Sequence, residues 1–279
     1  MIETFEVPIP ALQLNRTIRV YLPEGYAQTT TRYPVLYMHD GQYVFRDEDS
    51  PQGFSLRLEA YLEQEGIQTI VVAIDNNPDR NERINEYYAS PTGKFAEQIL
   101  GEPSPLGGKG DAYIDFVIQE LKPLIDDRYR TQPDRTYMAG CSSGAHISVY
   151  AACRYPSVIK RLGCLSSGFY RNQEALEQLI PTSDLSHVER VYMDCGDAEA
   201  GEGEPESEIN LAGNRAIYDL IRQQVEQTKF EIIEKGRHNY EWFIKRVPTM
   251  MDFLYQDEEI QAGKEDAKRL RKKRERAVH

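Results

Sequence analysis

The sequence predicts an α/β fold, with a mainly parallel central sheet, helices on both of its faces and an N-terminal antiparallel hairpin. Short apolar runs of strand length recur along the chain, separated by segments in which apolar residues have helical spacing. The first residues instead alternate between apolar and polar side chains, as in a hairpin with one solvated face. A length of 279 residues with 40% hydrophobic content suffices for one large domain.

The individual elements follow from these two periodicities. Continuous apolar runs predict buried strands at 35–38, 70–74, 136–139, 161–165, 191–194 and 230–233. Alternation places the hairpin at 4–7 and 16–22. Helical spacing predicts crossover helices at 55–65, 113–126, 145–154, 209–227 and 240–255. Residues 76–110 are polar and rich in Pro, Gly and Asn, which predicts a functional loop or lid.

Charge divides the chain into an acidic body and a basic end. We expect one domain over residues 1–258 and a charged, basic tail, helical or disordered, over 259–279. Residues 264–279 hold eight Lys or Arg against three acids, about +5 in a chain of net charge −12. The tail is expected to be a solvated extension or a basic contact for an anionic partner or surface. The acidic body disfavours nucleic acid as a partner, because phosphate binding needs a concentrated positive surface.

Several classes of protein are disfavoured by missing patterns. No run approaches the roughly 18 apolar residues of a membrane helix, and the first residues lack the basic and apolar stretches of a signal peptide. We therefore expect a soluble, cytoplasmic protein without membrane insertion. The four cysteines lack metal or redox spacing and are expected as free thiols, and neither a metal nor an organic cofactor is expected. Residues 107–110 lack the pattern of a phosphate-binding loop.

A serine motif carries the candidate chemistry. Residues 140–144 read Gly-Cys-Ser-Ser-Gly and fit the pattern G-x-S-x-G, in which a serine occupies a sharp turn between a strand and a helix. The predicted strand and helix on either side supply that setting. Ser142 is therefore the candidate nucleophile, and it needs a base to remove its proton.

Position selects the base among five histidines. His238 follows the strand predicted at 230–233, so it should lie at the same sheet edge as Ser142, because parallel strands all end at one edge. The other four fit less well by their places in the chain: His39, His146, His187 and His279. His238 is therefore the candidate general base.

The third group and the oxyanion donors come from two further loops. An acid placed between the serine and the histidine along the chain should follow the strand at 191–194, where Asp197 and Glu199 are both available. The backbone N–H of Ser143 should bind the oxyanion, with a second donor at Gly41 or Gln42 after the first central strand.

Taken together, these segments resemble the "Putative esterase" family of α/β-hydrolases, which includes esterase D-like, enterochelin esterase and feruloyl or acetyl-xylan esterase proteins. The resemblance covers most of residues 5–255, through segments 37–42, 74–76, 83–87, 107–111, 140–144 and 236–238. It implies an α/β-hydrolase fold and favours Glu199 over Asp197 as the acid. It also implies a substrate pocket near Asp40, Arg83, Glu86 and Tyr240. The chain departs from the family at Ala145, where a second glycine is common, and at Tyr240, where many relatives have Trp.

The expected activity is therefore hydrolysis of a small-molecule carboxylic ester through an acyl-enzyme, with Ser142, Glu199 and His238 as the triad. Acyl transfer to an alcohol would use the same triad, and a binding module that kept the fold without catalysis is a third reading. The natural substrate and the oligomeric state, a possible homodimer included, stay open.

Overall fold

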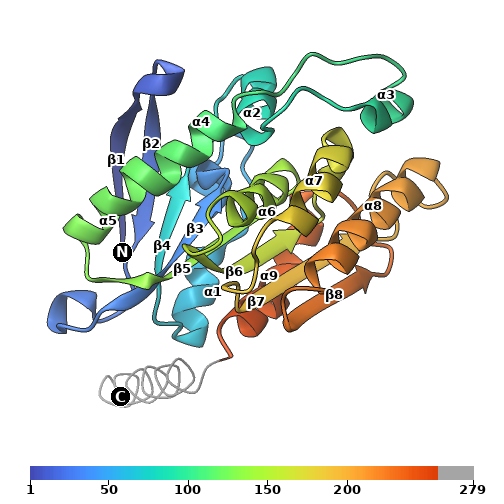
Figure 1. Ribbon diagram of the computed structural model, residues 1–279. Helices are drawn as coiled ribbons and strands as arrows, with labels where there is room; N and C mark the ends of the chain where they lie inside the picture. The colour runs from blue at the N-terminus through green and yellow to red at the C-terminus, as the bar shows by residue number, and fades with distance from the viewer. Residues whose placement is uncertain (257–279) are drawn as a thin grey trace.

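The computed structural model describes residues 1–256, apart from the side chain of Gln98, and contains a central sheet covered on both faces by helices (Figure 1). The basic tail expected over 259–279 lies outside the described residues. The strands are β1 (Ile2–Ile9), β2 (Leu14–Tyr21), β3 (Tyr33–His39), β4 (Ile70–Ile74), β5 (Thr131–Cys141), β6 (Ile159–Leu165), β7 (Arg190–Gly196) and β8 (Gln227–Ile233).

The sheet is parallel except at its N-terminal edge. The described strands form an eight-stranded sheet in the order β1-β2-β4-β3-β5-β6-β7-β8. Strands β1 and β2 form an antiparallel hairpin, and β2 pairs antiparallel with β4, whereas all pairs from β4 to β8 are parallel. The predicted α/β class, parallel core and edge hairpin are confirmed, and every predicted strand is present with longer or equal bounds except β2, which ends one residue before the predicted limit.

The helices occupy both faces of this sheet. Their bounds are α1 (Leu58–Glu65), α2 (Arg80–Tyr87), α3 (Lys94–Leu100), α4 (Gly110–Asp115), α5 (Lys122–Arg128), α6 (Ser143–Arg154), α7 (Gln173–Leu179), α8 (Pro205–Ile221) and α9 (Tyr240–Leu254). A π-helical stretch, Phe116–Leu121, joins α4 to α5. Apolar residues of α1 and α9 pack on one face, and those of α4 to α8 pack on the other.

Alternation along the buried strands supplies both cores. In β3, Val35 and Tyr37 belong to the core beneath α4 to α8, whereas Leu36 and Met38 belong to the core beneath α1 and α9. These strands are buried on both faces, which explains why their sequences are continuously apolar. Within residues 1–256, no helix combines the length and apolarity that a membrane span requires.

Residues 76–110 are not the simple loop that their composition suggested. The segment contains α2 and α3, which lie above the sheet at the top of Figure 1. Asp79 caps α2 by accepting hydrogen bonds from the backbone N–H groups of Asn81 and Glu82. The pair Asp79 and Glu82 is the sequence signature of a helix start, which a composition-based reading overlooks. Helix α7 was likewise not predicted.

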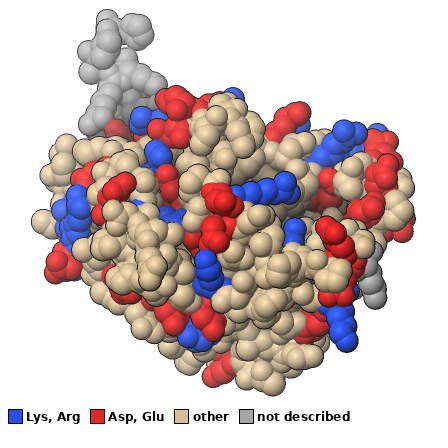
Figure 2. All heavy atoms as spheres, turned by 90° about the horizontal axis from the view of Figure 1, so that it is seen from above, with Lys and Arg blue, Asp and Glu red and all other residues tan. Residues whose placement is uncertain are grey.

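The surface above the sheet carries both signs of charge. Figure 2 looks down on the molecule from above the view of Figure 1 and shows acidic and basic side chains interspersed on this face. No broad, continuous basic area covers the described part of this face.

Candidate active site

Ser142 lies in a sharp turn between β5 and α6. Its backbone has φ +56° and ψ −124°, a conformation that costs a residue with a side chain roughly 1–3 kcal/mol. The backbone N–H of Ser142 donates to the carbonyl of Leu165 at 2.9 Å, and its own carbonyl accepts from the N–H of Gly168 at 3.0 Å. The turn is therefore held against the end of β6, with the serine side chain directed above the sheet.

Close packing requires the first glycine of the motif and leaves little room for a side chain at the second. A Cβ atom on Gly140 would lie 2.5 Å from the carbonyl carbon of Gly144, and one on Gly144 would lie 3.1 Å from the Cβ of His39. Real Cβ atoms do not approach backbone atoms as closely as the first of these distances. The spacing of the motif thus reflects the tight path of the chain around Ser142.

His238 joins Ser142 to Glu199. The Nε2 atom of His238 is 2.9 Å from the Ser142 hydroxyl, and its Nδ1 atom is 2.5 Å from Glu199 Oε2. With its proton on Nδ1, the ring donates to Glu199 and accepts from Ser142. The side chain of His238 is 38% exposed, whereas that of Glu199 is 2% exposed, so solvent reaches His238 but not Glu199.

The structure places Glu199, and not Asp197, against the histidine. Asp197 is exposed, and its carboxylate accepts a hydrogen bond from the backbone N–H of Lys235 at 2.6 Å. Glu199 Oε1 accepts from the backbone N–H of Gly196 and from the hydroxyl of Ser166, both at 2.6 Å. Asp197 therefore stabilises the loop, and Glu199 faces the site.

A buried arginine supports Glu199 from behind. Arg246 of α9 is 3% exposed, and its Nη1 donates to the Ser166 hydroxyl and to Asp194 Oδ1, the latter at 3.1 Å. Its Nη2 lies 3.6 Å from Glu199 Oε1. Burial raises the pKa of Asp194 to about 6, although the charge of Arg246 opposes this shift. The single guanidinium of Arg246 thus lies near two buried carboxylates, Asp194 and Glu199, and offsets part of their negative charge.

The pKa of Glu199 is lowered despite its burial. Burial alone would raise it, but the hydrogen bond and charge of His238, the hydrogen bond from Ser166 and the charge of Arg246 together outweigh that effect. The carboxyl group of Glu199 therefore remains ionised at neutral pH.

Backbone N–H groups without a helical acceptor follow Ser142 directly and also occur in the loop after β3. Ser143 is the first residue of α6, and Gly41 begins a short 3-10 helix (Gly41–Tyr43), so the N–H groups of Gly41, Gln42 and Ser143 have no partner within their own helices. A Cβ atom on Gly41 would lie 2.7 Å from three backbone atoms of residues 73–75, at the end of β4. Only glycine allows this loop to lie so close to the sheet.

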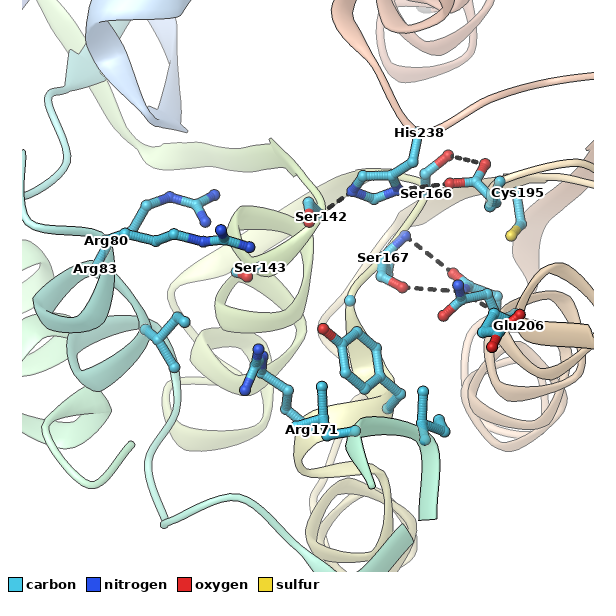
Figure 3. Close-up of a pocket in the computed structure, with 18 residues that line it drawn as sticks. Arg80, Arg83, Ser142, Ser143, Ser166, Ser167, Arg171, Cys195, Glu206 and His238 are labelled. Atoms are coloured by element: carbon cyan, nitrogen blue, oxygen red, sulfur yellow. Dashed lines mark hydrogen bonds and ion pairs between the residues drawn. The ribbon is translucent and has the colours of Figure 1, made fainter. Parts of the chain in front are cut away.

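A cavity of about 320 Å³ opens beside Ser142 (Figure 3). Ser142, Ser143, Glu199 and His238 line it together with residues that were not predicted from the sequence, among them Arg80, Ser166, Ser167, Tyr170 and Arg171. Arg83, which was predicted, also lines it. A second hollow of about 610 Å³ lies on the other side of His238 and is lined by Phe54, Tyr240 and Ile244 among others.

Two of the predicted pocket residues lie elsewhere. Glu86 is 1% exposed and pairs with Arg16, whose Nη2 is 2.6 Å from Glu86 Oε2, so it fastens α2 to the hairpin and does not line the cavity. Asp40 is 4% exposed and holds Arg83 through two hydrogen bonds of 2.6 and 2.8 Å. Buried carboxylates need such partners, which explains why neither is free for a substrate. Tyr240 lines the second hollow.

Among the described residues, none of the histidines set aside on sequence grounds forms a hydrogen bond with the hydroxyl of Ser142. His39 and His146 are buried, and burial lowers the pKa of His39 to about 4 and that of His146 to about 3. His39 Nδ1 is 2.8 Å from the hydroxyl of Tyr113. His187 is exposed just before β7, at the opposite end of the strands, and His279 lies outside the described residues.

The site residues that were not predicted differ in how far the sequence could have indicated them. Arg80 and Arg83 are one helical turn apart, and predicting α2 would have placed both on one face. Arg246 is a charge in the apolar stripe that contains Phe243, Val247 and Met250, and such a buried charge calls for a partner. Ser166 has no local signal, because only the fold brings it to Glu199.

A family model and a curated relative match the sequence along most of the chain. The family model described as "Putative esterase" matches residues 9–254. The "Uncharacterized protein YbbA" of Bacillus subtilis (strain 168) is 25% identical over 246 residues, which cover 86% of this chain and 93% of the relative.

Solved structures resemble the chain at lower identity. An IroE-like serine hydrolase from Shewanella oneidensis has a TM-score of 0.70 at 20% identity, covering 94% of this chain and 79% of its own. The enterobactin esterase FES from Shigella flexneri has a TM-score of 0.69 at 17% identity, covering 92% of this chain and 59% of its own. The BES protein from Bacillus cereus has a TM-score of 0.68 at 19% identity, covering 91% and 94%. At these identities the structures show a shared α/β-hydrolase fold, and the family match over most of the chain shows that this protein belongs to the Putative esterase family.

Proposed function

We propose that this protein is a serine carboxylic-ester hydrolase in which Ser142 is the nucleophile, His238 the general base and Glu199 the acid that orients the histidine. The observation that carries the proposal is the continuous hydrogen-bonded chain from Ser142 through His238 to Glu199. A serine hydroxyl is a weak nucleophile until a positioned base accepts its proton, and the base needs an acceptor for its other N–H.

The reaction then runs in two steps. The Ser142 oxygen attacks the ester carbonyl while His238 Nε2 takes the hydroxyl proton, and the same proton is passed to the departing alcohol. The resulting acyl-serine is attacked by a water molecule that His238 deprotonates, which releases the acid and restores Ser142. Glu199 remains ionised and stabilises the positive charge that His238 carries in each transition state.

The N–H groups of Ser143 and of the Gly41–Gln42 loop are the proposed oxyanion donors. Both sets begin a helix and have no helical acceptor, and the loop after β3 packs against the serine motif, since a Cβ atom on Gly144 would lie 3.2 Å from Asp40 Oδ2. Donors fixed before the reaction stabilise the developing negative charge without reorganising, and each is worth roughly 3 kcal/mol of barrier. Gln42 supports its loop through a hydrogen bond of 2.7 Å from its Nε2 to Asn76 Oδ1.

Hydrolysis is favoured over transfer by the exposure of the base. Acyl transfer to an alcohol requires that water be kept away from the acyl-enzyme, yet the side chain of His238 is 38% exposed. A purely binding role is disfavoured because Ser142 is held in a strained backbone conformation, which has a cost and no evident use outside catalysis.

The proposal predicts turnover and covalent labelling. Purified protein should hydrolyse p-nitrophenyl butyrate without added metal or cofactor, and a serine-directed fluorophosphonate should modify Ser142, as located by peptide mass spectrometry. Product formation that requires an alcohol acceptor would indicate a transferase. Absence of both turnover and labelling would indicate a binding module.

The acid can be tested with two neighbouring carboxamide variants. We expect Glu199→Gln to lower kcat by roughly 100- to 10,000-fold, because an amide can stabilise the wrong tautomer of His238 and cannot balance its charge. The matched variant Asp197→Asn should lower kcat less than about threefold, because its carboxylate contacts only the Lys235 N–H. The reverse pattern, measured by steady-state kinetics, would transfer the role to Asp197.

A further inference from the structure

Two arginines in the cavity have positive charges that no carboxylate of the described residues neutralises. Arg80 and Arg171 both line the cavity beside Ser142, and neither forms an ion pair or a side-chain hydrogen bond within residues 1–256. The guanidinium of Arg171 has one described contact, the ring of Tyr170 at 5.3 Å. Arg80 is exposed and Arg171 is half-buried, so solvent reaches both side chains.

Arg83 also lines the cavity, but unlike Arg80 and Arg171 it is paired with an acid of the protein. Asp40 binds it through two hydrogen bonds, and its guanidinium is centred 5.0 Å from the ring of Tyr87. Arg83 is therefore neutralised and fixed by the protein itself. Arg80 lies one turn earlier on α2, on the same side of the helix, but has no such acid.

The charges from several elements converge on one side of the cavity. Figure 3 shows Arg80 and Arg83 extending from α2 toward Ser142, with Arg171 rising from the segment after β6. Two carboxylates also line the cavity: Glu199 is engaged by His238, and Glu206 lies on α8, on the wall opposite α2. The acid nearest to Arg80 in sequence, Asp79, is used to cap α2. The unpaired positive charge is thus concentrated on the side formed by α2 and Arg171.

We propose that Arg80 and Arg171 form an anion-binding subsite, so that the preferred substrate is an ester carrying a carboxylate or phosphate group at the end that enters this cavity. Guanidinium groups form paired, charge-assisted hydrogen bonds with both anions. The anionic group would be held next to Ser142 without forming an ion pair with His238, because His238 remains hydrogen-bonded to Glu199. This inference rests on the proposed esterase function and specifies its substrate class.

Matched esters separate the anion from the rest of the substrate. For an anion on the acyl side, mono-p-nitrophenyl glutarate is compared with neutral p-nitrophenyl valerate. For an anion on the alcohol side, 4-carboxyphenyl butyrate is compared with its neutral methyl ester. We expect one anionic ester to exceed its neutral partner at least tenfold in kcat/KM, by an amount that falls as salt is added.

Charge-removing variants then assign that preference to the two arginines. Arg80→Gln and Arg171→Gln should each lower kcat/KM for the anionic ester by about 10- to 100-fold, the range for a lost charge-assisted hydrogen bond. Both should leave the neutral ester and the rate of fluorophosphonate labelling unchanged within about twofold. Arg222→Gln is the control, since Arg222 is exposed and pairs with Asp219 on α8, away from the cavity.

The outcomes distinguish the subsite from the catalytic proposal. Hydrolysis of the neutral esters with no anionic preference, or equal losses on both esters in the arginine variants, would overturn the subsite and leave the esterase intact. If no ester is hydrolysed, the esterase proposal fails, and calorimetric binding of the two anionic esters to Ser142→Ala still tests the subsite. Tight, salt-sensitive binding that Arg171→Gln weakens would support it, and absence of binding would overturn it.

Discussion

Replacing Ser142 by alanine should lower kcat for p-nitrophenyl butyrate by roughly 10,000- to a million-fold, to the level left by oxyanion donors and binding alone. The variant keeps His238 and Glu199 in place but has no oxygen to form the acyl-enzyme. Because alanine meets the same backbone strain at φ +56°, the free energy of unfolding should change by less than about 1 kcal/mol. Steady-state kinetics and urea unfolding measure the two effects separately.

The strain at this turn provides an internal comparison. Ser142→Gly should be equally inactive but more stable by about 1–3 kcal/mol, because glycine adopts the backbone conformation of residue 142 without a Cβ penalty. Ser186→Ala, at an exposed position before β7, should change neither activity nor labelling. Turnover in Ser142→Ala above about one per cent of wild type would show that another group performs the attack.

Much of this site follows from one property of parallel sheets. Ser142 and His238 are 96 residues apart in the sequence, yet both follow strands whose carboxyl ends lie at one edge of the sheet. In the structure, His238 Nε2 is 2.9 Å from Ser142 Oγ. Apolar runs identify those strands because burial on both faces excludes polar residues from them. The sequence therefore indicates where each strand ends, and hence which loops can contribute residues to a site.

Contacts between particular side chains are harder to predict from the sequence than the positions of strands. Spacing left Asp197 and Glu199 open because they are two residues apart in one loop. The family resemblance alone favoured Glu199, which the path of that loop turns toward His238. Glu86 is as polar as a pocket residue would be, but its partner Arg16 comes from the hairpin 70 residues earlier. The periodicity of apolar residues does not indicate an ion pair between such distant residues. Arg80 and Arg171 were missed because the segments that carry them, α2 and the stretch after β6, were not assigned an ordered structure.

Replacing Arg246 by methionine should lower the free energy of unfolding by about 3–5 kcal/mol, the usual cost of removing one partner from a buried ion pair. The change leaves Asp194, which is 0% exposed, and Glu199 without the guanidinium that lies near both. The adjacent variant Lys245→Met is the control. Lys245 is 54% exposed and pairs with Glu241 on the surface, so its loss should cost about 0.5 kcal/mol or less.

The pH dependence of that loss identifies its cause. Burial already raises the pKa of Asp194 to about 6 in the folded protein, above the value of about 3.9 for an unfolded chain, and removing Arg246 raises it further. A carboxyl group with a raised folded pKa destabilises the fold by an amount that grows as pH rises from the unfolded to the folded pKa and is constant above the folded pKa. The wild-type protein reaches that limit near pH 6, whereas the variant, with a higher folded pKa of Asp194, continues to lose stability above pH 6. The deficit of Arg246→Met should therefore be largest near pH 8 and shrink toward pH 5. Adding Asp194→Asn should recover part of it at pH 8, whereas a deficit independent of pH and of Asp194 would mean that Arg246 contributes by packing rather than by charge.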